Sequence, residues 1–404
     1  MGRVRFAMPE IQLPFVKSPR SPGVVLAFSC AAVDGRQERL RGRIVLRPVI
    51  SLGAFRGKAV IDKMIVRFSL TRVTQAAYLH GLLSAIPGAE KIHVEPVALS
   101  PHALTTFDLT IQEPSTATVL RVEDYLQTKF GLAVPPAMQL LEVSLDFWAD
   151  RASPEEKARL IGVLQRCYLP LQDIWSPRTR PRFNAGDAIG GRRFILPETD
   201  GPHLSPEKLK VHPVDATYYL GERDSDWMIR LMHKELDDQN PATGARRVLG
   251  PEEQRVRMEV VLRGEELRQH GLLQPRDLIG FRFTRLQGNH FRFLLPTIHA
   301  PEHPSRETLV GAMETWKDRN QRIEIFLRAG LIGLETERRA RRALREENRQ
   351  QIRSARKRLG VTTRPARQGS GLQANYIAYE ELNQVIQRAL EGLSKREATE
   401  MRRR

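Results

Sequence analysis

Two strand-like segments carry charged side chains on the side opposite their apolar residues. One of them, residues 141–147, has apolar residues at odd positions and places Glu142 and Asp146 on its polar side. The other alternates in the same way and places Arg257 and Glu259 on its polar side. Carboxylate oxygens are the ligands that hard divalent cations prefer, and arginine binds phosphate through paired hydrogen bonds. Together these residue types can hold a divalent cation and the phosphate of a ligand.

The spacing of the two acids within one strand limits how a cation could be bound. Four residues along a strand span roughly 13 Å, so Glu142 and Asp146 cannot both contact one ion unless the strand bulges. We therefore expect one of them, together with Glu259, to hold a divalent metal, Mg²⁺ or Mn²⁺. The alternative from the pattern alone is an ordinary solvent-facing sheet with cross-strand ion pairs.

A third segment, residues 218–234, reads as a strand, a tight turn at Gly221 and a second strand. Alternation places Arg230, Met232 and Lys234 on one side of the second strand. The two cationic side chains suit contacts with phosphates.

A sheet must position these segments. From residue 61 to about 148, the apolar pattern indicates strand, helix, strand, strand, helix and strand in that order. This order is typical of a ferredoxin-like arrangement, with two helices on one face of an antiparallel sheet and the other face open to a ligand. We therefore predict an α+β fold with an antiparallel sheet core. Ser115 and Gly131 are expected to cap the second helix, and Ser153 begins a further helix.

Later segments are read with the same rules. Residues 280–296 are expected to form a hairpin that turns at Gly288-Asn289. Helical patterning begins after residue 304 and breaks near residues 330–333, and another helix is expected over residues 376–393. The predicted division is an N-terminal arm or small β extension, a core and a helical basic C-terminal region, over residues 1–60, 61–300 and 301–404.

The helix expected over residues 335–359 is rich in arginine and has only a narrow apolar stripe. Such a helix can lie along DNA phosphates. The alternative is a solvated helix held by ion pairs one turn apart. The candidates for DNA contacts in this helix are Arg338, Arg342 and Arg345.

The composition favours a polyanionic partner. The 404 residues carry a formal net charge of +17, which points to nucleic acid before membrane, although a basic ordinary enzyme is the alternative. The two cysteines, Cys30 and Cys167, form no Cys-x-x-Cys pair, so a disulfide framework or a zinc ribbon is not expected. Prolines interrupt the N-terminal region, so we expect a cytoplasmic protein with no membrane segment. The oligomeric state is left open, with a homodimer as one option.

In order and spacing, the three charged segments resemble the replication initiation factor family. This family comprises rolling-circle initiator proteins of plasmids and filamentous phages, with relatives among the relaxases of conjugative elements. It shows Leu-Asp-x-Ala-x-Asp, then Tyr-x-Gly-x-Arg-x-Ser with Ile-Arg-x-Tyr-x-Lys, then Arg-x-Glu-x-Glu-Leu. In this chain the corresponding pieces are residues 141–146, 219–225 with 229–234, and 257–262. The resemblance covers roughly residues 60 to 300.

The resemblance implies a tyrosine that attacks a DNA phosphate with help from a divalent metal, leaving a free 3′ hydroxyl and a 5′ phosphotyrosyl link. Met232 stands where the family has this tyrosine, and a thioether cannot form a phosphoester. Glu142 replaces the first aspartate, and Val261 the second glutamate of the last motif. Either Tyr218 or Tyr219 has taken over as nucleophile, or the protein binds DNA without cutting it.

The expected function is therefore that of a DNA-binding replication initiator or relaxase-like protein of a mobile genetic element, a nicking endonuclease if it is catalytically competent. The competing hypothesis is an inactive DNA-binding regulator or accessory protein on the same scaffold. An RNA-binding ferredoxin-like module would want aromatic residues on the open sheet face, where these strands offer charges. The core residues expected to contact DNA phosphates are Arg223, Arg230, Lys234 and Arg257.

Overall fold

The computed structural model describes most of the chain, and the statements below concern the described residues. These are residues 8–17, 22–33, 40–97, 104–149, 153–176, 178–184, 192–196, 206–240, 245–299, 309–358 and 375–404.

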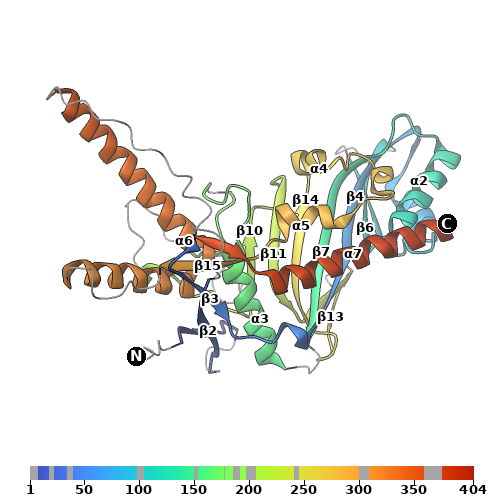
Figure 1. The fold of residues 1–404 in the computed structure, drawn as a ribbon. Helices are drawn as coiled ribbons and strands as arrows, with labels where there is room; N and C mark the ends of the chain where they lie inside the picture. Colours follow the sequence, from blue (N-terminus) through green and yellow to red (C-terminus); the bar gives the residue numbers. More distant parts are fainter. Residues whose placement is uncertain are drawn as a thin grey trace.

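The chain forms both strands and helices, with runs of consecutive strands at its start and over β8 to β14 (Figure 1). The strands are β1 (Glu10–Leu13), β2 (Val24–Ala32), β3 (Arg43–Pro48), β4 (Phe55–Thr74), β5 (Ile92–Pro96), β6 (Leu104–Gln112), β7 (Ala137–Ala149), β8 (Arg182–Asn184), β9 (Arg192–Phe194), β10 (Thr217–Leu220), β11 (Trp227–Lys234), β12 (Leu236–Asn240), β13 (Ala245–Val248), β14 (Arg255–Leu262), β15 (Leu294–His299) and β16 (Tyr376–Ala378). The α-helices are α1 (Ala76–Leu83), α2 (Thr116–Phe130), α3 (Pro154–Cys167), α4 (Gly264–His270), α5 (Gln287–His290), α6 (Leu309–Arg358) and α7 (Glu380–Arg403). Short 3₁₀ turns are η2 (Leu52–Ala54), η4 (Pro206–Lys208), η5 (Pro275–Leu278) and η6 (Phe283–Leu286).

A large antiparallel sheet forms the centre of the molecule. Its nine strands follow the order β5-β6-β4-β7-β14-β11-β10-β8-β9. The first half is built from the chain order β4-α1-β5-β6-α2-β7, which matches the alternation of strands and helices read from the sequence. The prediction of a mixed helix and antiparallel sheet fold is confirmed.

A smaller sheet joins the two ends of the chain. It has the order β1-β2-β3-β15-β16, so N-terminal strands pair with β15, and β15 pairs with a strand that precedes the last helix. The division of the chain at residues 60 and 300 stays a prediction. None of the described helices is both long and apolar enough to cross a bilayer.

The large sheet has one apolar face and one charged face. Val143, Leu145 and Phe147 of β7 are at most 2% exposed and belong to the main hydrophobic core. Helix α7 lies over this face, because Val385 of α7 and Phe147 both approach Gly57 of β4. In Figure 1, α3, α4, α5 and α7 lie on the same side of the sheet. The opposite face carries the charged side chains that are described below.

Local signals explain the helix ends that the sequence predicts. The Ser115 side chain accepts a hydrogen bond from the backbone N–H of Thr118, and Gly131 ends α2 with φ 71°. Ser153 caps α3 in the same way. Two expectations were wrong. Gly288 lies inside α5 instead of a hairpin turn, and residues 376–378 form β16 before helix α7 begins.

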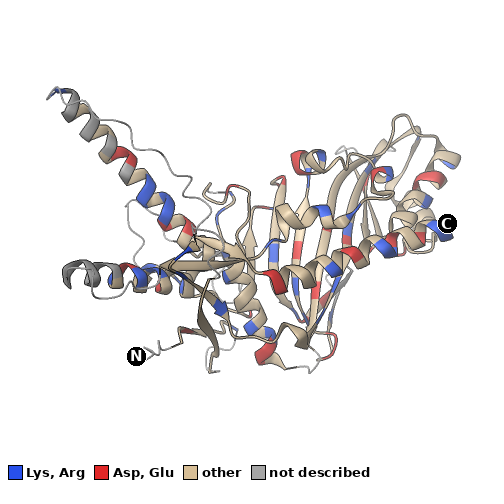
Figure 2. Cartoon of the chain, viewed as in Figure 1, with Lys and Arg blue, Asp and Glu red and all other residues tan. Residues whose placement is uncertain are grey.

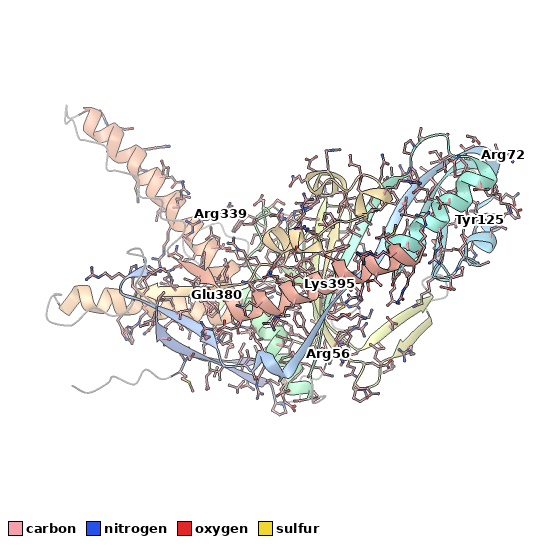
Figure 3. All side chains as sticks on the ribbon, turned by 45° about the vertical axis from the view of Figure 1, so that its right-hand side comes forward. Arg56, Arg72, Tyr125, Arg339, Glu380 and Lys395 are labelled. Atoms are coloured by element: carbon pink, nitrogen blue, oxygen red, sulfur yellow. The ribbon has the colours of Figure 1, made fainter. Side chains whose placement is uncertain are left out.

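The expected break in the long C-terminal helix is confirmed at Gly330, which has φ 67° and ψ −159° inside α6. A side chain there would bring its Cβ to 2.6 Å from the Cα of Arg166, so only glycine fits. The two arms of α6 diverge from this point (Figure 1). Arg339, on the second arm, lies at the opposite end of the molecule from Arg72 and Tyr125 (Figure 3).

Candidate functional site: the charged face of the large sheet

Strand register brings the three charged segments of the sequence together. Arg230 of β11 pairs with Glu259 of β14, which pairs with Ser144 of β7. Glu142, two residues before Ser144 on β7, lies on the same face, because alternate residues of a strand point the same way. Figure 2 shows basic and acidic residues on neighbouring strands at the centre of this sheet. The predicted convergence of acids and bases from separate strands is therefore present.

A β-bulge adds an acid that the sequence pattern did not reveal. The pairing of β4 with β7 shifts between Ile61 and Lys63, so Asp62 is the extra residue of the bulge. Simple alternation back from Met64, which is fully buried in the core, would have placed Asp62 on the apolar face. The Asp62 carboxylate instead bonds Arg257 on the charged face. The signal was present in the sequence, because the apolar positions change from odd at Ile61 to even at Met64.

Three carboxylates from three strands meet here. Asp62, Glu142 and Glu259 each offer an oxygen, and these oxygens lie within 4.8 Å of one another. Glu142 and Glu259 are only 1% and 3% exposed. The guanidinium of Arg230 bridges them, since it contacts Glu142 and its Nε lies 2.5 Å from Oε2 of Glu259. Lys63 Nζ lies 2.9 Å from Oε2 of Glu142. We call Asp62, Glu142 and Glu259 the carboxylate group.

Asp146 does not belong to the carboxylate group. Nε and Nη2 of Arg257 donate to its two oxygens at 2.5 and 2.7 Å, and Arg255 Nε lies 3.1 Å from it. Arg257 also donates to Asp62 at 2.6 Å and is 1% exposed. Arg257 therefore holds carboxylates in place and does not face solvent.

Burial and neighbouring charges set the ionisation of the carboxylate group. Burial raises the pKa of Glu259 to about 7, and Glu142 and Asp62 add to this rise while Arg230 opposes it. Burial also works against ionisation of Asp62, but Arg257 and other nearby cations outweigh it and hold the Asp62 pKa below its usual range. Glu259 is thus the member of the group whose charge changes near neutral pH.

The two candidate tyrosines lie on opposite faces of β10. Tyr218 is 1% exposed in the core beside His212, and burial raises its hydroxyl pKa far above the ordinary value. Tyr219 is half-buried on the charged face and pairs across the strands with Arg230, the residue that bridges Glu142 and Glu259. The Arg182 guanidinium stacks over the Tyr219 ring, with 5.2 Å between the guanidinium carbon and the ring centroid. Of the two, only Tyr219 shares a face with the carboxylate group.

The remaining candidates from the segment over residues 218–234 lie on β11 and in the turn that precedes it. Met232 pairs with Arg257 and lies on the same face as Arg230, two residues further along the strand. Lys234 is bound to Asp237 at 3.0 Å, and Arg223 is exposed in the turn between the two strands. Arg223 is thus free of the charged network described above and open to solvent.

The C-terminal arginines lie on the second arm of α6. Arg338 Nε donates to Glu335 at 2.8 Å, as in a helix held by its own ion pairs. Arg342 is exposed, and the side chain of Arg345 lies outside the described residues. Figure 2 shows Lys and Arg along this arm.

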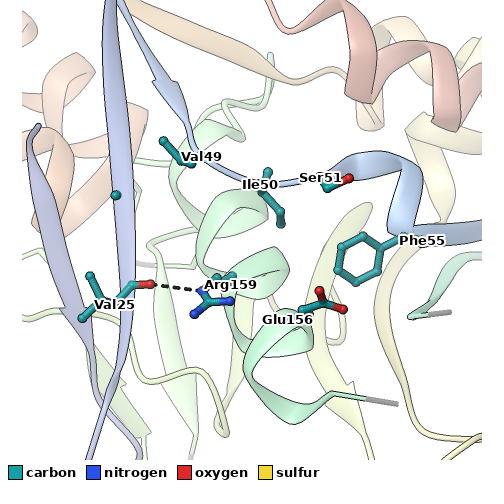
Figure 4. A pocket seen from close by; sticks show the side chains of 8 residues that line it. Val25, Val49, Ile50, Ser51, Phe55, Glu156 and Arg159 are labelled. Carbon is teal, nitrogen blue, oxygen red and sulfur yellow. Dashed lines mark hydrogen bonds between the residues drawn. The ribbon is translucent and has the colours of Figure 1, made fainter. Parts of the chain in front are cut away.

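A surface pocket of about 370 Å³ lies between β2 and α3, away from the charged face (Figure 4). Arg159 Nε donates to the backbone carbonyl of Val25 at 3.3 Å, and Glu156 is the acidic residue of the lining. The lining has one hydroxyl, Ser51, and one carboxylate, Glu156, and it includes no histidine or cysteine that could activate the hydroxyl or hold a metal with Glu156. The pocket therefore gives no alternative to the charged face.

The donor set of the carboxylate group suits a hard divalent cation. Its oxygens come from three carboxylates, which Mg²⁺ and Mn²⁺ prefer. Oε2 of Glu142 and Oε2 of Glu259 are buried and accept no hydrogen bond of regular geometry. Lys63 pairs with Oε2 of Glu142, and Arg230 pairs with Oε2 of Glu259 and with Oε1 of Glu142. A cation therefore fits only if the guanidinium of Arg230 moves away from these carboxylates.

No family model and no curated protein matches this sequence. Among solved structures, the chain is similar to the rolling circle replication initiator protein from Geobacillus stearothermophilus, with 11% sequence identity and a TM-score of 0.27. The match covers 66% of this chain and 98% of that chain. A likeness this weak assigns neither a family nor an activity, so the function must be argued from the residues of the charged face.

Proposed function

We propose that the protein is a DNA-binding replication initiator or relaxase-like protein of a mobile genetic element, and that Tyr219 cuts DNA on the charged face of the large sheet. One observation carries this proposal. Tyr219 stands across the strands from Arg230, which bridges two members of a group of three carboxylates that suits a divalent cation. The ferredoxin-like reading of β4 to β7, which leaves this face open to a ligand, belongs to the same proposal.

In the proposed reaction, the Tyr219 hydroxyl oxygen bonds to a DNA phosphorus and the bond from phosphorus to the 3′ oxygen breaks. The phenol proton passes to water or to a carboxylate, and the departing 3′ oxygen is protonated. A divalent cation held by the carboxylate group would polarise the phosphate and stabilise the departing oxygen. Arg230, displaced from Glu142 and Glu259, is placed to bind a phosphate oxygen, and Arg223 and Lys234 extend the basic surface.

The test is incubation of the protein and Mn²⁺ with supercoiled DNA that carries the sequence flanking its gene. We expect relaxed DNA with protein linked to its 5′ end. Tyr219→Phe should abolish the covalent product and keep DNA binding. Tyr78→Phe is the matched control, because Tyr78 is exposed on α1, and it should nick normally.

A second candidate is an inactive DNA-binding regulator on the same scaffold. Two observations favour it, the methionine at position 232 and the guanidinium of Arg230 lying between the carboxylates. DNA binding without relaxation by the wild-type protein would establish this candidate and end the nicking proposal. Nicking that survives Tyr219→Phe would remove Tyr219 from its role.

A further inference from the structure

A second cluster of metal-ligating side chains lies apart from the carboxylate group. Glu266 and His270 stand one turn apart on α4, and His290 ends α5. Each offers one ligand atom, and these atoms lie within 4.8 Å of one another. All three residues are buried, with exposed fractions of 7%, 5% and 0%. Neither the fold prediction nor the proposed DNA chemistry uses them.

Two of the three separations between the ligand atoms match the edge of a small tetrahedron. Nε2 of His270 and Nε2 of His290 face each other at 3.2 Å, and Nε2 of His290 lies 3.4 Å from Oε2 of Glu266. Zinc binds nitrogen and carboxylate oxygen at about 2.0–2.1 Å, and the edge of such a tetrahedron is about 3.3–3.4 Å. The ligand atoms of the remaining pair, His270 and Glu266, lie within 4.8 Å, so an ion among the three atoms would require only a small movement of these side chains.

Charge and hydrogen bonding leave this cluster incomplete without an ion. Oε2 of Glu266 is buried and has no hydrogen-bond partner of regular geometry. No ion pair between Glu266 and a lysine or arginine is found among the described residues, in contrast to the carboxylate group, where Arg230, Lys63 and Arg257 supply the positive charge. A single proton on Nε2 of His290 faces both Nε2 of His270 and Oε2 of Glu266 and cannot satisfy the two together, whereas a dication contacts all three atoms.

Neighbouring groups hold the second ring nitrogen and the backbone of His290. The side-chain amide of Gln172 lies 3.3 Å from Nδ1 of His290 and 3.4 Å from Oε1 of Glu266. The Tyr168 hydroxyl donates to the backbone carbonyl of His290 at 2.9 Å. The contacts of Gln172 are made by its amide nitrogen, which donates. A metal-binding histidine donates its other N–H to an outer partner, so a bound ion requires the Gln172 amide to turn its oxygen towards Nδ1.

We infer that Glu266, His270 and His290 form a zinc site, with a solvent molecule as the fourth ligand. Two imidazole nitrogens and one carboxylate oxygen form a ligand set that zinc takes, while Mg²⁺ and Mn²⁺ prefer oxygen alone. The ion would join α4, which directly follows β14, to α5, about twenty residues later in the chain. Its role would be to hold these two short helices in place against the apolar side of the sheet.

The experiment uses the full chain, stripped of metal with a chelator and titrated with Co²⁺, which reports tetrahedral coordination through intense visible absorption. We expect one Co²⁺ per chain with this spectrum, displacement by Zn²⁺ at the same stoichiometry, and a higher Tm with Zn²⁺. Glu266→Gln keeps the shape of the side chain and removes its charge, and it should weaken binding by at least about tenfold.

Two controls separate this site from others. His93→Gln alters an exposed histidine that pairs with Glu95 at 3.1 Å, a surface pair of the same residue types, and it should leave the Co²⁺ spectrum unchanged. Asp62→Asn alters the carboxylate group and should also leave the Co²⁺ spectrum unchanged. The test of this zinc site is therefore independent of the test of the carboxylate group. Absence of the spectrum in the wild type, an unchanged Co²⁺ affinity in Glu266→Gln, or loss of the spectrum in Asp62→Asn would overturn the assignment.

Discussion

Replacing Arg230 by methionine tests whether this guanidinium occupies the space that a cation needs. Methionine is of similar length and carries no charge, so the change removes the bridge between Glu142 and Glu259 and little else. If the carboxylate group is a cation site, Arg230→Met should bind Mn²⁺ more tightly than the wild-type protein does. If the group is only an ion-pair network, the variant should bind Mn²⁺ no better.

The size of the effect follows from the contacts. A cation must displace two ion pairs of Arg230, and a hydrogen bond to a charged group contributes about 1.5–3 kcal/mol, or about 3–6 kcal/mol for the two. Part of this gain is lost because the pKa of Glu259 rises further when Arg230 no longer opposes its protonation. A net gain of about 2–4 kcal/mol corresponds to a Kd for Mn²⁺ about 30- to 700-fold lower.

Isothermal titration calorimetry with Mn²⁺ at pH 8 measures this Kd directly. Arg67→Met is the matched control. Arg67 lies on β4, on the charged face of the sheet, and binds Asp108 instead of the carboxylate group. It should leave the Kd within about threefold. Without metal, Arg230→Met should be less stable to denaturant, because two buried carboxylates lose a partner. An unchanged or higher Kd in a folded Arg230→Met protein would refute the cation site.

Three further outcomes follow from the described contacts. Because Glu259 must lose a proton to bind a cation and its pKa is about 7, Mn²⁺ affinity should rise about tenfold from pH 6 to pH 8 and then level off, in calorimetry across that range. Arg257→Met should lower the free energy of unfolding by about 3–5 kcal/mol in urea titrations, because it leaves buried acids without their partner, and a loss below about 1 kcal/mol would contradict this. Gly330→Ala should cost at least about 2 kcal/mol, because its backbone conformation suits only glycine and Arg166 fills the space, whereas Gly81→Ala, in a helix with open space, should be neutral or stabilising.

The parts of the fold that the sequence predicted are those set by local chemistry. Helix α2 begins after Ser115 and ends at Gly131 because a hydroxyl cap and a positive φ are decided within a few residues. The strands that carry the charged segments were recognised because they alternate over eight or more residues. The sequence predicts the break at Gly330 from the residue type. It does not show that the backbone of Arg166 lies so close that any side chain at position 330 would clash with it.

The parts that escaped prediction depend on distant segments or on a change of register. Gly288-Asn289 is a strong turn signal, yet the surrounding segment packs as η6 and α5, whose Leu286 is fully buried in the core. For that reason His290, which ends α5, could not be placed beside α4 from the sequence. Asp62 was missed because one extra residue in β4 reverses which side chains face the core. A change in the parity of apolar positions is the signal that could have located it.

The cost of the charged face argues that it is kept for a function. Four carboxylates and four cations meet there, and several are almost completely buried; they are Asp62, Glu142, Asp146, Glu259, Lys63, Arg230, Arg255 and Arg257. Replacing a buried ion network by apolar residues is often neutral or stabilising, so stability alone does not explain it. Leu140, Met228 and Val261 form a small apolar patch on the same face, which shows that apolar side chains can pack on this face of the sheet. Moreover, burial leaves Glu259 with a pKa near 7, so one carboxylate of the network changes charge at neutral pH. A carboxylate with this pKa can exchange its proton for a cation at neutral pH, as metal binding by the carboxylate group would involve.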